Sequence, residues 1–296
     1  MVNKATPELR LAAGYADALL REKGIDQFPV DPRQLAEDAG ITVLELPAGT
    51  DGCSGMLIHR GGAFGIMYST AVDSGGYQRF SIAHELGHYY LPGHPDAVLR
   101  DGQHSSMAGY VSADAYEREA DQFAAELVLP ERLVRPVLGR LEDGMQSVRG
   151  LAEAAIASLS ASGIAYARYT RSAVAVVMST GGRVEFCSFS DALKDARVGW
   201  LKRGDAVPAT SLTSELHRAP DRILAAESLS GETSLTHWFG SDRKLTVVEE
   251  AVGLGRYGKV LTILHVPGLT SSDEGLETDE QEEAALLESW TPRFHR

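Results

Sequence analysis

The chain has 296 residues, of which 44% are hydrophobic, and a formal net charge of −13. This length exceeds one ordinary hydrophobic core and suits two or three compact units. The hydrophobic fraction excludes wholesale disorder. The acidic balance opposes non-specific binding to nucleic-acid phosphates, so direct nucleic-acid binding is not expected and a partner with a basic surface fits better.

The composition also bears on the compartment. Cys53 and Cys187 are the only cysteines, too few for a disulfide framework and without the Cys-x-x-Cys spacing of a thiolate zinc site. Such sparing cysteine use suits a reducing compartment. The first residues lack the apolar stretch of a secretory signal, and no window reaches the roughly 18 apolar residues of a membrane span. We therefore predict a soluble, cytoplasmic protein without a membrane partner.

The first half of the chain is predicted to place short elements before two strong helices. Gly24, Gly40 and Pro130 set helix ends, and Asp31 followed by proline sets a helix start. Apolar arms around Gly61-Gly62 predict a β-hairpin, since glycine supplies the positive φ angles of a tight turn. The predicted elements are helices at Leu9–Lys23 and Pro32–Ala39, a strand at Ile41–Leu46, a hairpin at Gly55–Tyr68, and helices at Gln78–Leu91 and Ala115–Leu129.

A long polar, Gly-rich loop is predicted between the two strong helices, and loops of this length are often functional. Beyond these helices, the second half of the chain changes from helical to β-like patterns. After Pro130 the pattern indicates a small unit of helix-turn-helix type, and β-like alternation begins near Ala173. The predicted elements are helices at Leu133–Leu141 and Val148–Ser160, a turn at Ser160–Gly163, a helix at Ile164–Tyr169, and strands at Val174–Met178, Val184–Phe189, Leu245–Val248 and Val260–Val266.

The residues His84-Glu85-Leu86-Gly87-His88 lie within one of the strong helices. Residues four apart on a helix face the same side, so His84 and His88 could bind one tetrahedral metal ion. Glu85 would then be the general base that takes a proton from the attacking water. Gly87, costly inside a helix, indicates close packing against another element. The alternative is an exposed helix that carries two histidines by chance.

Glu117 is the predicted third ligand, because a catalytic zinc site keeps three protein ligands and one open position. Asp121 lies on the same helix face and could accept the second ring N–H of a zinc-bound histidine. Ala120, which is small, would let the two helices approach closely. Two alternatives stay open: Glu117 as part of a capping box begun by Asp114, and Glu119 as the ligand in its place.

The substrate side of the site is less defined by the sequence. A peptidase needs a donor for the oxyanion that forms on attack, and His94, His104 and Tyr110 of the long loop are the candidates. The hairpin Met56 to Tyr68 could offer an edge strand to an extended peptide, or it could be purely structural.

The run Arg79 to His88, with Glu117, Ala120-Asp121 and Phe123 to Pro130, resembles the ImmA/IrrE family of zinc metallopeptidases. The resemblance is specific over about residues 52–130, and the remainder resembles more weakly the larger IrrE-type architecture. It implies an α+β chain with a zincin-like metallopeptidase domain (1–131), a helix-turn-helix-like helical unit (132–170) and a GAF-like α+β sensor domain (171–270). The acidic composition of residues 271–296 separately predicts a flexible tail.

The same resemblance implies a function. A family member would be a zinc-dependent endopeptidase that cleaves a helix-turn-helix transcriptional repressor, a DNA-binding protein, in a stress response. The C-terminal domain could bind a small-molecule signal. The cofactor would be Zn²⁺, although two histidines and a glutamate also accept Mn²⁺ or Fe²⁺.

Two other functions compete with this one. The chain could be a non-catalytic transcriptional regulator or sensor with a structural metal, or a phage-immunity or toxin–antitoxin partner. The segment from Leu141 to Tyr169 has two basic and three acidic residues, whereas a DNA-recognition helix carries an excess of basic residues. This helical unit is therefore expected to serve packing or interaction.

Overall fold

The computed structural model describes residues 6–47, 52–106, 114–240 and 245–271, which form two compact units. Unit 1 contains the described residues up to Leu133 together with Glu153–Ser158. Unit 2 contains Val134–Ala152 and the described residues from Leu159 onward. Each unit combines helices with one sheet, so the predicted α+β class is confirmed. The helical segment 132–170 divides between the units, and the acidic tail beyond residue 271 lies outside the described residues.

The sheet of unit 1 has four strands in the order β1-β3-β2-β4. The predicted hairpin is confirmed: β2 (Gly55–Arg60) and β3 (Ala63–Tyr68) pair antiparallel around two glycines with φ of 60° and 81°. β1 (Thr42–Glu45) pairs parallel with β3, and β4 (Gln103–Ser106) pairs antiparallel with β2. Both hairpin strands are thus paired on either side, so the hairpin itself offers no free edge to a substrate.

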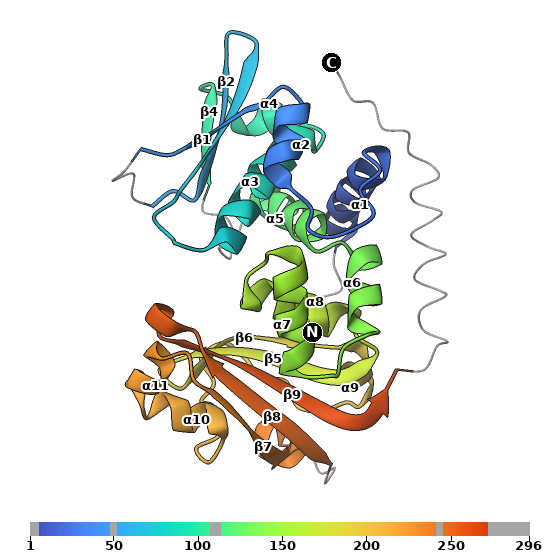
Figure 1. Ribbon diagram of the computed structural model, residues 1–296, viewed down its shortest axis with the longest axis vertical. Helices are drawn as coiled ribbons and strands as arrows, with labels where there is room; N and C mark the ends of the chain where they lie inside the picture. The colour runs from blue at the N-terminus through green and yellow to red at the C-terminus, as the bar shows by residue number, and fades with distance from the viewer. Residues whose placement is uncertain (1–5, 48–51, 107–113, 241–244, 272–296) are drawn as a thin grey trace. The chain divides into compact units, whose positions relative to one another are not determined.

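Three helices of unit 1 pack together: α1 (Pro7–Glu22), α3 (Gly75–Tyr90) and α5 (Ala115–Val128) (Figure 1). α1 is amphipathic as predicted and buries a stripe of alanine and leucine residues. α3 contacts α5 and also β2 and β3, so its middle is buried on every side from Ser81 to His88. A helix in this position carries its polar side chains into the interior, where each needs a partner.

Four shorter helices complete the first part of the chain. α2 begins at the predicted proline, and Asp31 accepts hydrogen bonds from the backbone N–H groups of Arg33 and Gln34, as expected of its N-cap. The predicted loop after Pro92 in fact contains α4 and β4. The bounds are α2 Pro32–Asp38, α4 His94–Val98, α6 Glu131–Leu138 and α7 Met145–Ala155.

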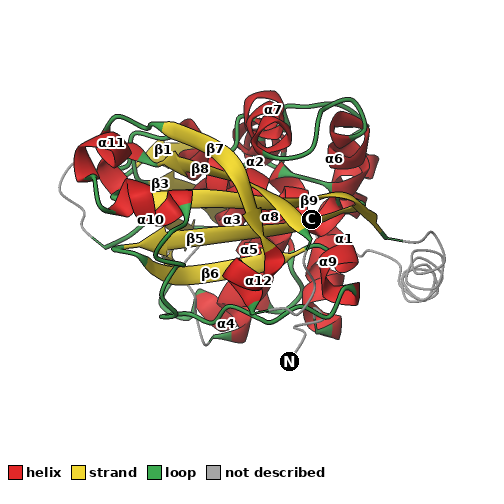
Figure 2. Cartoon of the chain, turned by 90° about the horizontal axis from the view of Figure 1, so that it is seen from below, coloured by secondary structure: helices red, strands yellow, loops and turns green. Residues whose placement is uncertain are grey.

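The sheet of unit 2 has five strands in the order β6-β5-β9-β8-β7, and every neighbouring pair is antiparallel (Figure 2). β5 is buried over almost its whole length, so both of its faces are covered. The bounds are α8 Leu159–Tyr169, β5 Ser172–Thr180, β6 Arg183–Phe189, α9 Asp191–Asp195, α10 Leu212–His217, α11 Pro220–Leu224, β7 Ser228–Ser234, α12 Leu235–Phe239, β8 Thr246–Gly253, a 3-10 turn at Gly255–Tyr257, and β9 Lys259–Thr270.

The turn predicted at Ser160–Gly163 is wrong. α7 ends at Ala155 and α8 already begins at Leu159, so the break lies between them, where Ile156 has a φ of 51°. Gly163 is instead buried inside α8, where an added Cβ would lie 3.1 Å from a methyl group of Val176 on β5. This glycine allows a helix to approach a strand and does not form a turn.

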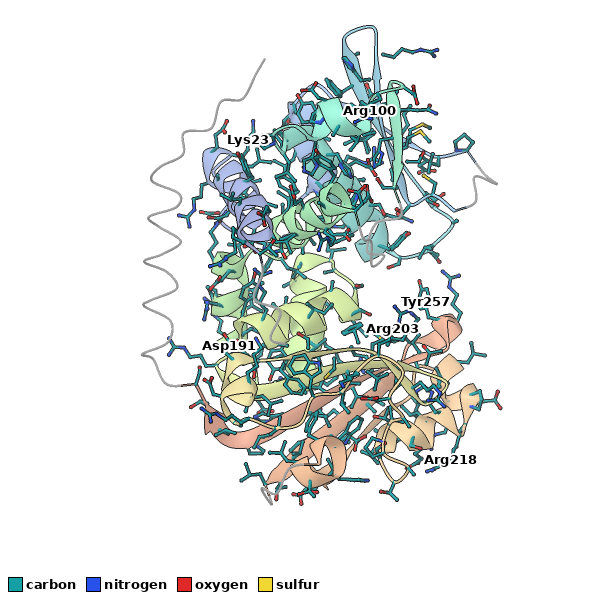
Figure 3. The ribbon with its side chains drawn as sticks, turned by 180° about the vertical axis from the view of Figure 1, so that it is seen from behind. Lys23, Arg100, Asp191, Arg203, Arg218 and Tyr257 are labelled. Atoms are coloured by element: carbon teal, nitrogen blue, oxygen red, sulfur yellow. The ribbon has the colours of Figure 1, made fainter. Side chains whose placement is uncertain are left out.

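Charged side chains lie on the outside of each unit. Lys23 and Arg100 are exposed on unit 1, and Asp191, Arg203 and Arg218 are exposed on unit 2 (Figure 3). None of the described helices combines the length and apolar character that crossing a membrane requires.

Candidate metal centre

The buried middle of α3 carries the three residues of the predicted motif. Ser74 caps the helix by accepting a hydrogen bond from the backbone N–H of Tyr77. About two to three turns beyond Tyr77, His84, Glu85 and His88 each have an exposed fraction of 0%. Three polar side chains on one helix are therefore removed from water, which is costly unless they bind something.

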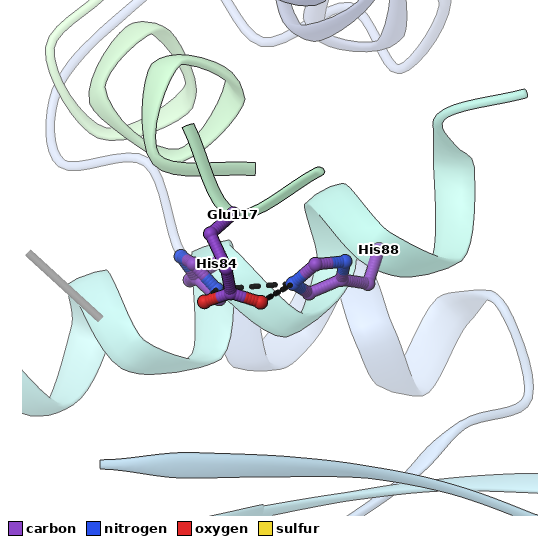
Figure 4. Close-up of side chains that lie close together, drawn as sticks. All are labelled: His84, His88 and Glu117. Atoms are coloured by element: carbon purple, nitrogen blue, oxygen red, sulfur yellow. Dashed lines mark hydrogen bonds and ion pairs between the residues drawn. The ribbon is translucent and has the colours of Figure 1, made fainter. Parts of the chain in front are cut away.

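Glu117 of α5 meets both imidazoles (Figure 4). Its Oε2 lies 3.5 Å from Nε2 of His84, and its Oε1 lies 3.2 Å from Nε2 of His88. The two Nε2 atoms are 3.1 Å apart. These three residues form a group whose donor atoms all lie within 4.8 Å of one another, and it is the one such group found among the described residues. Two nitrogens and one oxygen at this spacing could hold a metal ion.

Close packing of α3 on α5 sets this spacing. A Cβ atom added to Gly87 would lie 3.0 Å from Cα and 3.3 Å from Cβ of Ala120. Only a glycine facing a small residue allows the two helix backbones to come so near. The predicted close approach through Gly87 and Ala120 is therefore confirmed.

The acidic side chains of α5 point to different partners. Asp114 does cap α5, but through the backbone N–H of Tyr116. Glu117 turns to the imidazoles and takes no part in the cap contacts described. Glu119 points to another histidine: its Oε2 lies 3.1 Å from Nε2 of His94.

Asp121 supports His84 from the opposite side of its ring. Nδ1 of His84 donates a hydrogen bond of 2.8 Å to Oδ1 of Asp121, which leaves Nε2 directed at Glu117. Burial lowers the pKa of His84, but the hydrogen bonds to Asp121 and Glu117 outweigh burial and raise it to about 10. Burial opposes ionisation of Glu117, yet hydrogen bonds from His104 and His84 bring the pKa of this carboxyl far below its ordinary value.

His88 and Glu85 are shifted mainly by burial. The loss of hydration lowers the pKa of His88 to about 4, so this imidazole is neutral and has a nitrogen lone pair for a metal. Burial raises the pKa of Glu85 to about 7, although the charge of His84 opposes the shift. A carboxylate with a pKa near neutrality is suited to general-base catalysis.

The donor set and Glu85 agree with a zinc ion. Zinc takes imidazole nitrogen and carboxylate oxygen, and three protein donors leave one position for water or substrate. Among the described residues, neither carboxylate oxygen of Glu85 has a hydrogen-bond partner, although the side chain is entirely buried. A buried carboxylate without a partner, on the same helix turn as the imidazoles of His84 and His88, is expected where a water or substrate binds.

The three candidate oxyanion donors are not equivalent. His104 lies on β4, and its Nε2 is 2.8 Å from Oε1 of Glu117. His104 therefore lies beside the group formed by His84, His88 and Glu117, called the donor group below. His94 is 1% exposed and lies behind His88, with the two Nδ1 atoms 3.2 Å apart. This position suits a contact to the ring of His88 better than one to a substrate. Tyr110 lies outside the described residues.

Sequence reasoning missed one residue of the site, Gly55 on β2. A Cβ atom there would lie 2.6 Å from Oε1 of Glu85. The signal available was a glycine inside a predicted strand, which often marks the close approach of another group. The sequence does not show which group approaches.

A mixed sheet beside a helix with the His-Glu-x-x-His pattern, and a glutamate from a second helix, defines the zincin-like class of metallopeptidase domains. Residues 36–161 match the family model described as Peptidase_M78, the IrrE N-terminal-like domain. Residues 36–161 are therefore similar to the IrrE N-terminal-like domain of the M78 peptidases, and the family resemblance noted in the sequence is confirmed over this part of the chain.

Comparison with solved structures extends the similarity beyond this domain. A Mycobacterium tuberculosis transcriptional regulator matches with a TM-score of 0.55 and 15% sequence identity, over 86% of this chain and 76% of that chain. At this identity the match shows a shared fold, and its coverage includes parts of both units. Comparison with curated proteins finds no match.

Proposed function

We propose that the chain is a zinc-dependent endopeptidase whose metal ligands are His84, His88 and Glu117 and whose general base is Glu85. One observation carries this proposal: a buried, unpartnered carboxylate stands beside a group of two imidazoles and a carboxylate that could hold a metal. The M78 family model over residues 36–161 supports it.

Each residue has a defined task in this proposal. Zinc supplies Lewis acidity that lowers the pKa of a water molecule towards 7. Glu85 accepts the proton of the attacking water and returns it to the leaving amine, which its pKa of about 7 permits. Asp121 holds the ring of His84 through Nδ1. His104 is the preferred oxyanion donor, because its Nε2 lies at the donor group.

The substrate would bind along β4. This short strand forms one edge of the sheet and carries His104, whereas β2 and β3 are paired on both sides. An extended peptide could add to β4 through backbone hydrogen bonds, with its scissile bond near the donor group. This position replaces the hairpin considered from the sequence.

We further propose that the substrate is a helix-turn-helix repressor cleaved in a cytoplasmic stress response. The resemblance to the ImmA/IrrE family supports this substrate class, and a protein of the same fold is named a transcriptional regulator. A repressor has the basic surface that a chain of net charge −13 would attract. In this proposal the GAF-like domain (171–270) receives the activating signal.

The test is to incubate the zinc-loaded chain with the helix-turn-helix repressors of its own genome. One discrete cut in one repressor is expected. Glu85→Gln should abolish the cut while zinc content and the circular dichroism spectrum stay unchanged, because the ligands remain. Cleavage by the Glu85→Gln variant at the wild-type rate would remove Glu85 as the base.

A second function is a non-catalytic regulator in which the metal is structural. The fold shared with a protein named a transcriptional regulator favours it. Gel-shift titration over a range of salt concentrations separates the two functions: tight, steeply salt-dependent duplex binding without cleavage would support the regulator.

A further inference from the structure

His88 is held from behind by a second histidine. Nδ1 of His88 lies 3.2 Å from Nδ1 of His94, while Nε2 of His88 faces Glu117. On its other side, Nε2 of His94 lies 3.1 Å from Oε2 of Glu119. The three side chains form a hydrogen-bonded series that runs from the donor group to the partly exposed carboxylate of Glu119.

The backbone after α3 builds this contact. Gly93 has a φ of 78°, a left-handed conformation that suits glycine, and it turns the chain back towards the end of α3. The N–H of His94 donates a hydrogen bond to the carbonyl of Leu91, one turn beyond His88. The ring of Tyr116 packs edge-on against His94, with ring centroids 4.9 Å apart. The position of His94 is therefore fixed by the fold around it.

The order of donors in the series follows from the carboxylate at its end. Glu119, when ionised, can only accept a hydrogen bond, so Nε2 of His94 must carry the proton. A neutral His94 then has a lone pair on Nδ1, which accepts a hydrogen bond from the Nδ1–H of His88. A neutral His88 with its proton on Nδ1 has its lone pair on Nε2, the atom that faces His84 and Glu117.

We propose that His94 and Glu119 are positioning residues that fix the tautomer and the ring orientation of His88 for metal binding. This inference rests on the proposed function, since it takes His88 as a ligand. It gives each ligand histidine a carboxylate on its outer nitrogen: Asp121 reaches His84 directly, and Glu119 reaches His88 through His94. Such contacts orient the ring and raise its basicity towards the metal.

The test measures zinc affinity of the full chain by competition with a chromophoric chelator. His94→Leu removes the acceptor and should weaken zinc binding about 10- to 100-fold, the usual effect of losing such a partner. His94→Asn can place its side-chain carbonyl where Nδ1 lies in histidine, so it should restore most of the affinity despite its smaller size. Glu119→Ala should fall between wild type and His94→Leu. Arg118→Ala, the adjacent exposed position on α5, is the matched control and should match wild type.

A second measurement reads the tautomer directly. In the metal-free wild type, ¹⁵N chemical shifts should show a single form of His88 with the proton on Nδ1, and Glu119→Ala should convert it to a mixture. This measurement needs no enzymatic activity, and it tests the role of His94 and Glu119 even if His94→Leu does not fold. A wild-type His88 with its proton on Nε2, or equal zinc affinity of His94→Leu and wild type, would overturn the inference. A wild type that binds no zinc would instead overturn the proposed function, while the shifts would still report on the series.

Discussion

Gly55 on β2 leaves the space that the carboxylate of Glu85 on α3 occupies. A Cβ atom at position 55 would lie 2.6 Å from Oε1 and 3.1 Å from Cγ of Glu85. We expect Gly55→Ala to displace the carboxylate and to lower turnover about 100-fold, the usual effect of moving a catalytic group by about 1 Å. Zinc content should stay at the wild-type level, because none of the proposed metal ligands is changed. Turnover and bound zinc measured on the same samples check this.

Gly65→Ala provides the matched control for this substitution. Gly65 lies on β3 of the same sheet, and a Cβ there would lie 3.6 Å from the carbonyl oxygen of Thr42, an ordinary contact. It should therefore keep wild-type turnover. Equal losses in both variants would mean that the sheet, and not the Glu85 contact, is responsible.

Glu85 should make the stability of the metal-free protein depend on pH. Burial raises its pKa from 4.5 to about 7, so its favourable contribution is fully present below pH 4.5 and is lost as pH rises through 7. Glu85→Gln cannot ionise and does not show this loss. The free energy of unfolding of the variant, relative to that of wild type, should therefore rise by about 3 kcal/mol between pH 4.5 and pH 8. Urea unfolding of both metal-free proteins at several pH values measures this. A difference that does not change with pH would contradict the burial of an ionisable Glu85.

Zinc binding should release a proton from His84. Its pKa of about 10 in the metal-free protein means that the ring is charged at neutral pH, whereas a ligand must be neutral. Deprotonation of His84 should therefore make zinc affinity rise about tenfold per pH unit below pH 10, and the affinity should level off above pH 10. Calorimetry in buffers of different ionisation enthalpy counts the protons released.

Two substitutions test the origin of that proton. Asp121→Asn weakens the hydrogen bond that raises the pKa of His84, so fewer protons should be released at pH 8. Asp26→Asn, at an exposed position of unit 1, should leave proton release as in wild type. Binding without proton release in the wild type at pH 8 would show that His84 is already neutral.

Gly87→Ala should separate α3 and α5, the helices that carry the proposed metal ligands. Helix propensity alone favours alanine by about 1 kcal/mol. The added Cβ would however lie 3.0 Å from Cα of Ala120, which is backbone and cannot rotate away. Overpacking of this kind costs about 1–3 kcal/mol, so we expect a less stable protein that also binds zinc more weakly. Gly139→Ala, whose Cβ would lie 3.5 Å from its nearest contact, should show neither change. A more stable Gly87→Ala variant would show that the helices have room to move.

The parts of the site that follow from helix periodicity could be predicted from the sequence. His84 and His88 are four apart on α3, and Glu117 and Asp121 are four apart on α5, so each pair shares a face whatever the rest of the fold does. The hairpin was predictable for a similar reason, since Gly61 and Gly62 determine a turn locally.

Features that depend on distant partners could not be predicted. β4 has the polar sequence Gln-His-Ser-Ser without apolar alternation, and it is a strand because it pairs with β2. In the sequence, Gly163 resembles a glycine of a turn, because its contact with Val176 is visible only in the fold. The contacts of Gly55 with Glu85 and of His94 with Glu119 join residues that are 25 or more positions apart. No local pattern contains that information.

The donor atoms at the proposed metal centre are two imidazole nitrogens and one carboxylate oxygen, without sulfur. Peroxide converts a cysteine thiolate to sulfenic and then sulfinic acid, and a zinc ion held by thiolates loses its ligands in this way. Imidazole and carboxylate groups do not undergo these steps. A metal held by His84, His88 and Glu117 would thus stay bound during oxidative damage that empties zinc fingers.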